Sequence, residues 1–117
     1  MENTKYDLED RTFKFAQDVR MVINEISKST TNIEDGIQVT RSSGSVGANY
    51  IEANEALSKK DFLMRIKICR KEAKESNYWL RLLNTKYNVK FREEIDRLTQ
   101  ESKELMMIFS SIMRKYS

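Results

Sequence analysis

Four long stretches of this chain carry apolar residues every three to four positions, and no proline interrupts them. This spacing is typical of an α-helix, because residues three and four apart lie on the same helical face. No stretch of useful length alternates between apolar and polar residues as a half-buried strand does. We therefore predict an all-α fold with helices at about residues 8–27, 33–56, 60–86 and 91–115. Because the predicted connections are short, consecutive helices should pack antiparallel, as an up-down-up-down four-helix bundle in one domain, residues 1–117.

Each predicted helix has an apolar stripe that we assign to the core of the bundle. In chain order the stripes are Phe15, Val19, Val22, Ile23 and Ile26; Ile33, Ile37, Gly44, Gly47, Ala48 and Ile51; Phe62, Ile66, Cys69, Ala73, Leu80, Leu83 and Tyr87; and Ile95, Leu98, Leu105, Ile108, Ile112 and Met113. The run Ser42–Ala48 is unusual within a helix, since each glycine costs roughly 1 kcal/mol relative to alanine. We predict that the second helix is nevertheless continuous, because small side chains let a neighbouring helix approach closely. A Gly/Ser loop is the alternative.

The second and third helices carry further apolar residues that lie off these stripes. Surplus apolar faces often mark association, and Trp and Tyr are common interface anchors. We therefore expect contacts between copies of the chain. The expected interface residues are Val39, Val46, Tyr50, Ile68, Trp79 and Leu82. A wide monomer core, or scattered exposed apolar side chains, is the alternative.

A polar row separates the two apolar stripes of the second helix: Gln38, Arg41, Ser45, Asn49 and Glu52. One interpretation is a binding site, since Arg and Asn recognise phosphate groups and base edges. The favoured interpretation is a hydrogen-bonded network that fixes helix register or subunit packing. Arg41 and Glu52 are ~16 Å apart along one helix and cannot pair. The ionic partner of Arg41 must come from another helix or chain, and Glu72 and Glu75 are candidates.

The net charge of +3 is concentrated in one part of the chain. Residues 58–90 hold ten basic and three acidic side chains. Six of these basic residues fall within an arc of roughly 100° that is turned away from the core stripe of the third helix. They are Lys60, Lys67, Arg70, Lys71, Lys74 and Arg81. Such a basic stripe can follow a phosphate backbone, although a solvated helix face is its commoner role.

The composition argues against several enzyme classes. The chain has no histidine, the commonest general base and metal ligand. Cys69, the single cysteine, lies on a core stripe and is expected to be a small buried apolar residue in a reducing compartment. No phosphate-binding glycine loop or nucleophile elbow occurs. We therefore expect no enzymatic activity, catalytic residue, metal, cofactor or small-molecule substrate.

The chain also lacks the sequence signals of a membrane or secreted protein. No apolar run approaches the roughly 18–20 residues that cross a bilayer. The polar, acidic start lacks the pattern of a secretory signal. We therefore expect a cytoplasmic protein with no membrane partner.

The run Gln38–Ala53, QVTRSSGSVGANYIEA, resembles the second helix of a bacterial four-helix bundle family. Its founding members are encoded by intervening sequences in 23S ribosomal RNA genes and are often labelled S23 ribosomal proteins. Ser58–Phe62 and Glu72–Leu80 are similar to the third helix of that family, so the resemblance covers nearly the whole chain. It implies an up-and-down bundle and a homopentameric ring, and it does not imply an enzyme. In a related branch, the accessory variability proteins of diversity-generating retroelements, a basic pentamer partners a reverse transcriptase and nucleic acid.

Together these features predict a non-enzymatic homo-oligomer, a pentamer by the resemblance. Its further partner would be RNA, bound through the basic stripe of the third helix, or a nucleic-acid enzyme. The resemblance also singles out Arg41, Ser45, Asn49 and Glu52 for a structural or interface role. The alternative is a protein-binding adaptor or scaffold without nucleic-acid contact, and a hydrolase with a carboxylate-bound metal is the weakest hypothesis.

Overall fold

The structure is a computed structural model that describes residues 4–117. Its elements are α1 (Thr4–Glu25), α2 (Thr30–Asn54), α3 (Lys59–Leu83), the short 3-10 helix η1 (Lys86–Phe91) and α4 (Arg92–Tyr116). No strand occurs within this part of the chain. The predicted all-α fold with four long helices is therefore confirmed. The third helix is shorter than predicted, because Asn84 leaves the helical region at φ −82° and ψ 75°.

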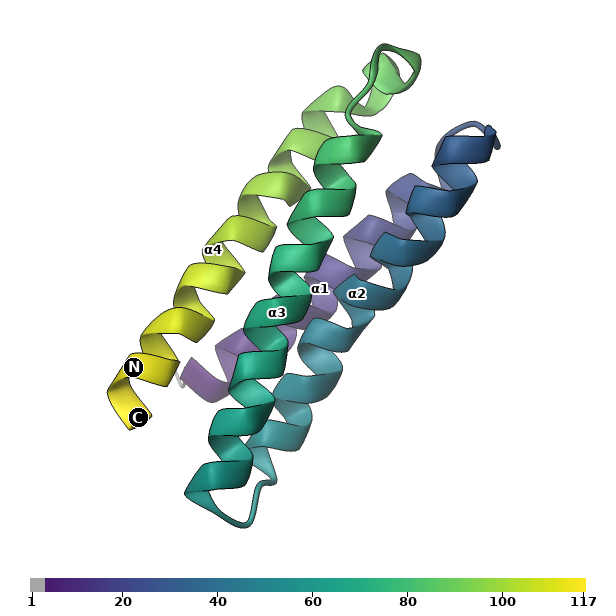
Figure 1. Ribbon diagram of the computed structural model, residues 1–117. Coiled ribbons are helices and arrows are strands. Elements are labelled where there is room, and N and C mark those ends of the chain that lie inside the picture. The colour runs from purple at the N-terminus through teal and green to yellow at the C-terminus, as the bar shows by residue number, and fades with distance from the viewer. Residues whose placement is uncertain (1–3) are drawn as a thin grey trace.

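Consecutive long helices run in opposite directions, and their connections alternate between the two ends of the bundle (Figure 1). The beginning of α1 and the end of α4 consequently lie at the same end (Figure 1). Each long helix packs against the next, and α4 returns to contact α1. Serine caps set the start of two helices: the hydroxyl of Ser29 accepts from the backbone N–H of Asn32, and that of Ser58 accepts from the N–H of Asp61.

The core is built from the predicted stripes of α1, α3 and α4 with few changes. Val19, Ile66, Leu98 and Leu105 are fully buried, as expected. Tyr87 is 80% exposed because it lies in η1, beyond the end of α3, so its assignment to the core was wrong. The core also contains Phe109, which the sequence analysis missed. Its ring lies 5.9 Å from that of Tyr50, centroid to centroid.

The predicted inner face of α2 was wrong. Val39 and Val46 are fully buried and Tyr50 nearly so, which removes these three residues from the expected interface between copies. Ile37, which was assigned to the core, is instead 59% exposed, and Ile33 and Ile51 are also exposed. The physical reason is that α2 contacts α1 on one side and α3 on the other. The face between these two contacts, which carries Val39, Val46 and Tyr50, is the one that is buried in the bundle.

The continuous α2 helix was predicted correctly, as was the reason for its small residues. A Cβ atom on Gly47 would lie 2.9 Å from Oγ1 and 3.2 Å from Cβ of Thr12 on α1. A Cβ atom on Gly36 would lie 3.1 Å from Cγ2 of Ile23. The glycines therefore mark the side of α2 that α1 approaches closely.

Two asparagines join both connections at one end of the bundle. The amides of Asn32 and Asn88 exchange two hydrogen bonds of 2.9 Å. Asn88 also donates to the carbonyl of Leu83 and Asn32 to that of Ser27. Both asparagines are buried, so this pair fixes the α1–α2 connection against η1.

Candidate functional site

The predicted basic stripe is present on the outer surface of α3. All six of its cations are exposed: Lys60, Lys67, Arg70, Lys71, Lys74 and Arg81. None of the six forms an ion pair with any residue that the structure describes. The stripe therefore presents positive charge that no described acidic side chain neutralises by direct pairing.

Three of these cations line a groove between α3 and α4. Arg70, Lys71 and Lys74 form one wall, and Arg114 of α4 stands on the other with Ser110 and Ser111. The groove has a volume of about 710 Å³, and no acidic residue lines it. The sequence analysis missed Arg114. The only signal was a basic residue in the last turn of α4.

The other members of the stripe lie outside this groove. Lys60 and Lys67 border a separate hollow at the start of α3, together with the apolar side chains of Leu63 and Met64. Arg81 lies near the other end of α3, where its Nε donates to Oδ1 of Asn77. The structure thus divides the stripe into a central groove and two flanks.

Cations on the opposite side of α4 have acidic partners. Arg11 of α1 lies 2.8 Å from carboxylate oxygens of both Glu101 and Glu104 on α4. Arg97 lies 2.8 Å from Asp18 and 2.7 Å from Glu94. The hydrogen bond from Arg97 lowers the pKa of Glu94. The seam between α1 and α4 is therefore electrostatically compensated, whereas the α3–α4 groove is not.

The polar row of α2 makes contacts with α3. As anticipated, Arg41 pairs with Glu75 at 3.0 Å and with the buried carboxylate of Glu72 at 3.6 Å. Asn49 donates to the hydroxyl of Ser45 and accepts from Arg65 of α3. These contacts favour the interpretation of Arg41, Ser45 and Asn49 as a network between helices.

The two remaining members of the row, Gln38 and Glu52, are exposed. Neither side chain takes part in the contacts of this network. The structure therefore brings only part of the polar row into contact with α3, and a role for Gln38 and Glu52 stays a prediction.

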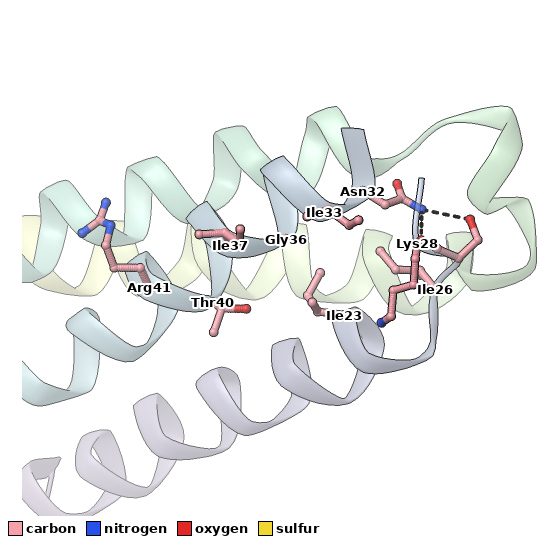
Figure 2. A pocket seen from close by; sticks show the side chains of 10 residues that line it. Ile23, Ile26, Lys28, Asn32, Ile33, Gly36, Ile37, Thr40 and Arg41 are labelled. Carbon is pink, nitrogen blue, oxygen red and sulfur yellow. Dashed lines mark hydrogen bonds between the residues drawn. The ribbon is translucent and has the colours of Figure 1, made fainter. Parts of the chain in front are cut away.

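A second surface feature is an apolar seam between α1 and α2. We define the α1–α2 seam by the residues that line two grooves of about 460 and 430 Å³ along it. Its apolar members are Phe13, Ala16, Ile23, Ile26, Ile33, Ile37, Ala48 and Ile51. Figure 2 shows Ile23 of α1 together with Ile33 and Ile37 of α2 around the first groove. The surplus apolar surface expected from the sequence thus exists, but on this seam. Of the predicted α3 interface residues, Leu82 is exposed, while Ile68 and Trp79 are half-buried.

The single thiol is placed as a core side chain. Cys69 is fully buried and donates to the carbonyl of Val46. Burial raises its pKa to about 12, which keeps the thiol neutral. Over residues 4–117, no group of three or more carboxylate or cysteine side chains is placed to hold a metal ion. None of the described helices is long and apolar enough to span a bilayer.

Comparisons with known proteins identify a matching family and similar solved structures. The sequence model of the family described as 23S rRNA-intervening sequence protein matches residues 4–111. Among solved structures, a protein of unknown function from the S23 ribosomal protein family of Bacteroides thetaiotaomicron is similar, with a TM-score of 0.83 and 29% sequence identity. That similarity covers 96% of this chain and 99% of the other. No curated protein matches the chain.

Proposed function

This chain belongs to the 23S rRNA-intervening sequence protein family, and on that premise we propose that it is a non-enzymatic homo-oligomer that associates with RNA through the outer face of α3. The observation that carries the RNA proposal is the set of six exposed α3 cations, none of which has an acidic partner among the described residues. The protein acts in the cytoplasm, without a metal, a cofactor, a membrane or a small-molecule substrate.

Unpaired cations are suited to a polyanion for a thermodynamic reason. A phosphate that meets a lysine or arginine releases condensed counterions, and this release favours binding at low salt. A cation that already has a carboxylate partner contributes much less, because the partner must be displaced first. Arg11 and Arg97 are of this second kind. The six exposed α3 cations are of the first kind, and they concentrate positive charge on one helix of a chain whose total charge is only +3.

The α1–α2 seam supports self-association. Ile37 and Phe13 are mostly exposed there, and burying them against a second copy would remove their apolar surface from water. The resemblance to the intervening-sequence family points to five copies in a ring. A ring repeats the α3 face in every subunit, so that a weak contact with RNA becomes stronger through avidity.

A charge-reversal pair tests the RNA association. Lys71→Glu/Lys74→Glu removes two cations from the α3 face, and Lys86→Glu/Lys90→Glu makes the same charge change at exposed sites in η1. We expect the first variant to weaken binding to a structured RNA strongly. We also expect it to reduce the slope of log K against log salt by about 1.5, since each lost phosphate contact removes about 0.7–0.9. The control should keep most of the affinity, and both variants should keep native helicity. Equal loss in both variants would refute a localised site.

Light scattering on a sizing column tests the oligomer. We expect a mass about five times the chain mass of 13.9 kDa. Ile37→Glu should shift this mass to that of a single chain while helicity is kept, because it places a charge on the α1–α2 seam without touching the core. If the unmodified protein has the mass of a single chain at micromolar concentration, self-association is contradicted.

The same seam favours a second candidate function, a protein-binding adaptor without nucleic-acid contact. The two candidates differ in one measurement. Negligible RNA binding even at low salt would remove the RNA proposal and leave the adaptor.

A further inference from the structure

Building on the proposed RNA association, we infer that the ligand of the α3–α4 face is an unpaired RNA strand, whose phosphates lie in the groove between the two helices and one of whose bases stacks on Tyr78.

The groove provides cations on both of its walls. Arg70, Lys71 and Lys74 reach it from α3 and Arg114 from α4, with two methionines, Met106 and Met107, also lining it. The guanidinium of Arg114 donates to the hydroxyl of Ser111. A strand that lies along this groove meets positive charge from both sides. Packed helix axes are about 8–10 Å apart, so a groove between them accepts one strand more readily than a duplex.

Tyr78 lies on the same face of α3 as Lys74, outside the residues that line the groove. It lies four residues after Lys74, which places the two side chains on the same helical face. The Tyr78 side chain is 49% exposed, although it is a large aromatic group. The outer face of α3 thus joins a cationic groove to an exposed aromatic ring.

Two neighbours support the ring of Tyr78. The centroid of the Trp79 ring lies 5.1 Å from that of the Tyr78 ring, and the two rings meet edge to face. The guanidinium carbon of Arg81 lies 5.9 Å from the centroid of the Tyr78 ring. Cationic grooves combined with aromatic rings are the usual means of holding single strands, because any unpaired base can stack on such a ring. In an RNA duplex the bases are stacked on one another and are not available to Tyr78.

The chain supplies an internal probe for this contact. Trp79 is the single tryptophan, and it touches the proposed stacking residue. A base that stacks on Tyr78 should therefore change the emission of Trp79. We expect an unpaired RNA of about a dozen nucleotides to change this emission on binding, and the same RNA annealed to its complement to leave it nearly unchanged.

Binding is measured by fluorescence anisotropy of end-labelled RNA. Tyr78→Ala should weaken binding of the unpaired strand by about five- to a hundredfold, and Tyr78→Phe should restore it, because the ring alone stacks. The affinity for the duplex should be the same in both variants. A Tyr78→Phe variant that binds as poorly as Tyr78→Ala would overturn the stacking contact.

Arg114→Glu tests the second wall of the groove. It should weaken binding of the unpaired strand and reduce the slope of log K against log salt by about 0.7, because one phosphate contact is lost. Lys90→Glu is the charge-matched control, and it should change neither the affinity nor the salt slope strongly. An Arg114→Glu protein that binds like the control would remove α4 from the site.

The outcomes separate this inference from the proposed function. If unpaired and duplex RNA bind equally and Tyr78→Ala has no effect, the inference fails while the association of α3 with RNA survives. If neither RNA binds at low salt, both fail. Circular dichroism of each variant shows whether the bundle is intact.

Discussion

Truncation of two residues on α2 tests which face of that helix belongs to the core. Val39 is fully buried and Ile37, two positions earlier, is 59% exposed. Both lie within the same continuous helix, so that Val39→Ala and Ile37→Ala share one backbone context. The sequence pattern alone assigned the core role to Ile37, and the structure assigns it to Val39.

The expected magnitudes differ by a factor of about four. Val39→Ala removes two buried carbon groups at about 0.8 kcal/mol each and leaves a cavity, which together cost about 2–3 kcal/mol. The better helix propensity of alanine returns about 0.5 kcal/mol, so the net loss of unfolding free energy is about 2 kcal/mol. Ile37→Ala removes three carbon groups that are less than half buried. That burial is worth about 1 kcal/mol, and the same propensity gain offsets about half of it and leaves a net loss of about 0.5 kcal/mol.

The assay is urea unfolding followed by far-ultraviolet circular dichroism. It is run over a range of protein concentrations, because association of folded chains raises the apparent stability. At the lowest protein concentration Val39→Ala should lower the urea midpoint of unfolding without changing the slope of the unfolding free energy against urea concentration. Ile37→Ala should have nearly the same midpoint as the parent protein. At high concentration Ile37→Ala should also lose stability, since the α1–α2 seam then contributes through association.

Two results would refute this reasoning. The first is an equal loss for both variants at every concentration, which would place Ile37 in the core. The second is a Val39→Ala protein that becomes monomeric with unchanged unfolding free energy, which would return Val39 to an interface. Leu82→Ala is a useful reference, because its side chain is exposed on α3 and should affect folding little.

Three further predictions follow from single contacts. Gly47→Ala should lower the thermal unfolding midpoint despite the better helix propensity of alanine, because the new Cβ would lie 2.9 Å from Oγ1 of Thr12. Gly44→Ala should leave the midpoint unchanged, because its Cβ would meet only the flexible end of the Arg20 side chain. Asn88→Ala should lower the unfolding free energy by about 2–3 kcal/mol, since it leaves a buried amide partner unpaired; urea unfolding measures this. The buried Cys69 thiol should react with a disulfide reagent only on unfolding. Burial raises the pKa of this thiol from 9.0 to about 12, so the folded protein favours the neutral thiol. The resulting stabilisation of the folded state is fully present below pH 9.0 and is lost as the pH rises towards 12. Labelling at a rate independent of urea would contradict burial.

Helical periodicity predicted most of the core because three of the helices have one dominant apolar stripe. On α4, for example, Ile95, Leu98 and Leu105 lie on one face and are all buried. The α2 helix has two apolar stripes of similar strength, and periodicity cannot choose between them. The glycines were interpreted correctly as a close approach, but they face α1 and mark the edge of the core. The isoleucines next to them line the outer rim of that contact.

The candidate site was predicted only on its α3 side. Lys71 and Lys74 were found because residues on one helix face recur at a fixed period. Arg114 stands opposite them only because α4 folds back antiparallel to α3, and no local pattern links positions so far apart in the chain. The partners of Arg41 were correctly proposed, since Glu72 and Glu75 are the acidic residues near the middle of α3.

The sequence by itself determined four helices, their approximate limits and a cationic outer face on the third, because each depends on residues within a few turns of one another. Tertiary structure decided which stripe of α2 is buried, where the unused apolar surface emerges, and which cations gain acidic partners. These outcomes depend on how each helix is rotated against its neighbours. That rotation follows from packing over the whole bundle, in which the small residues of α2 and the Asn32–Asn88 pair fix the approach of helices distant in the chain.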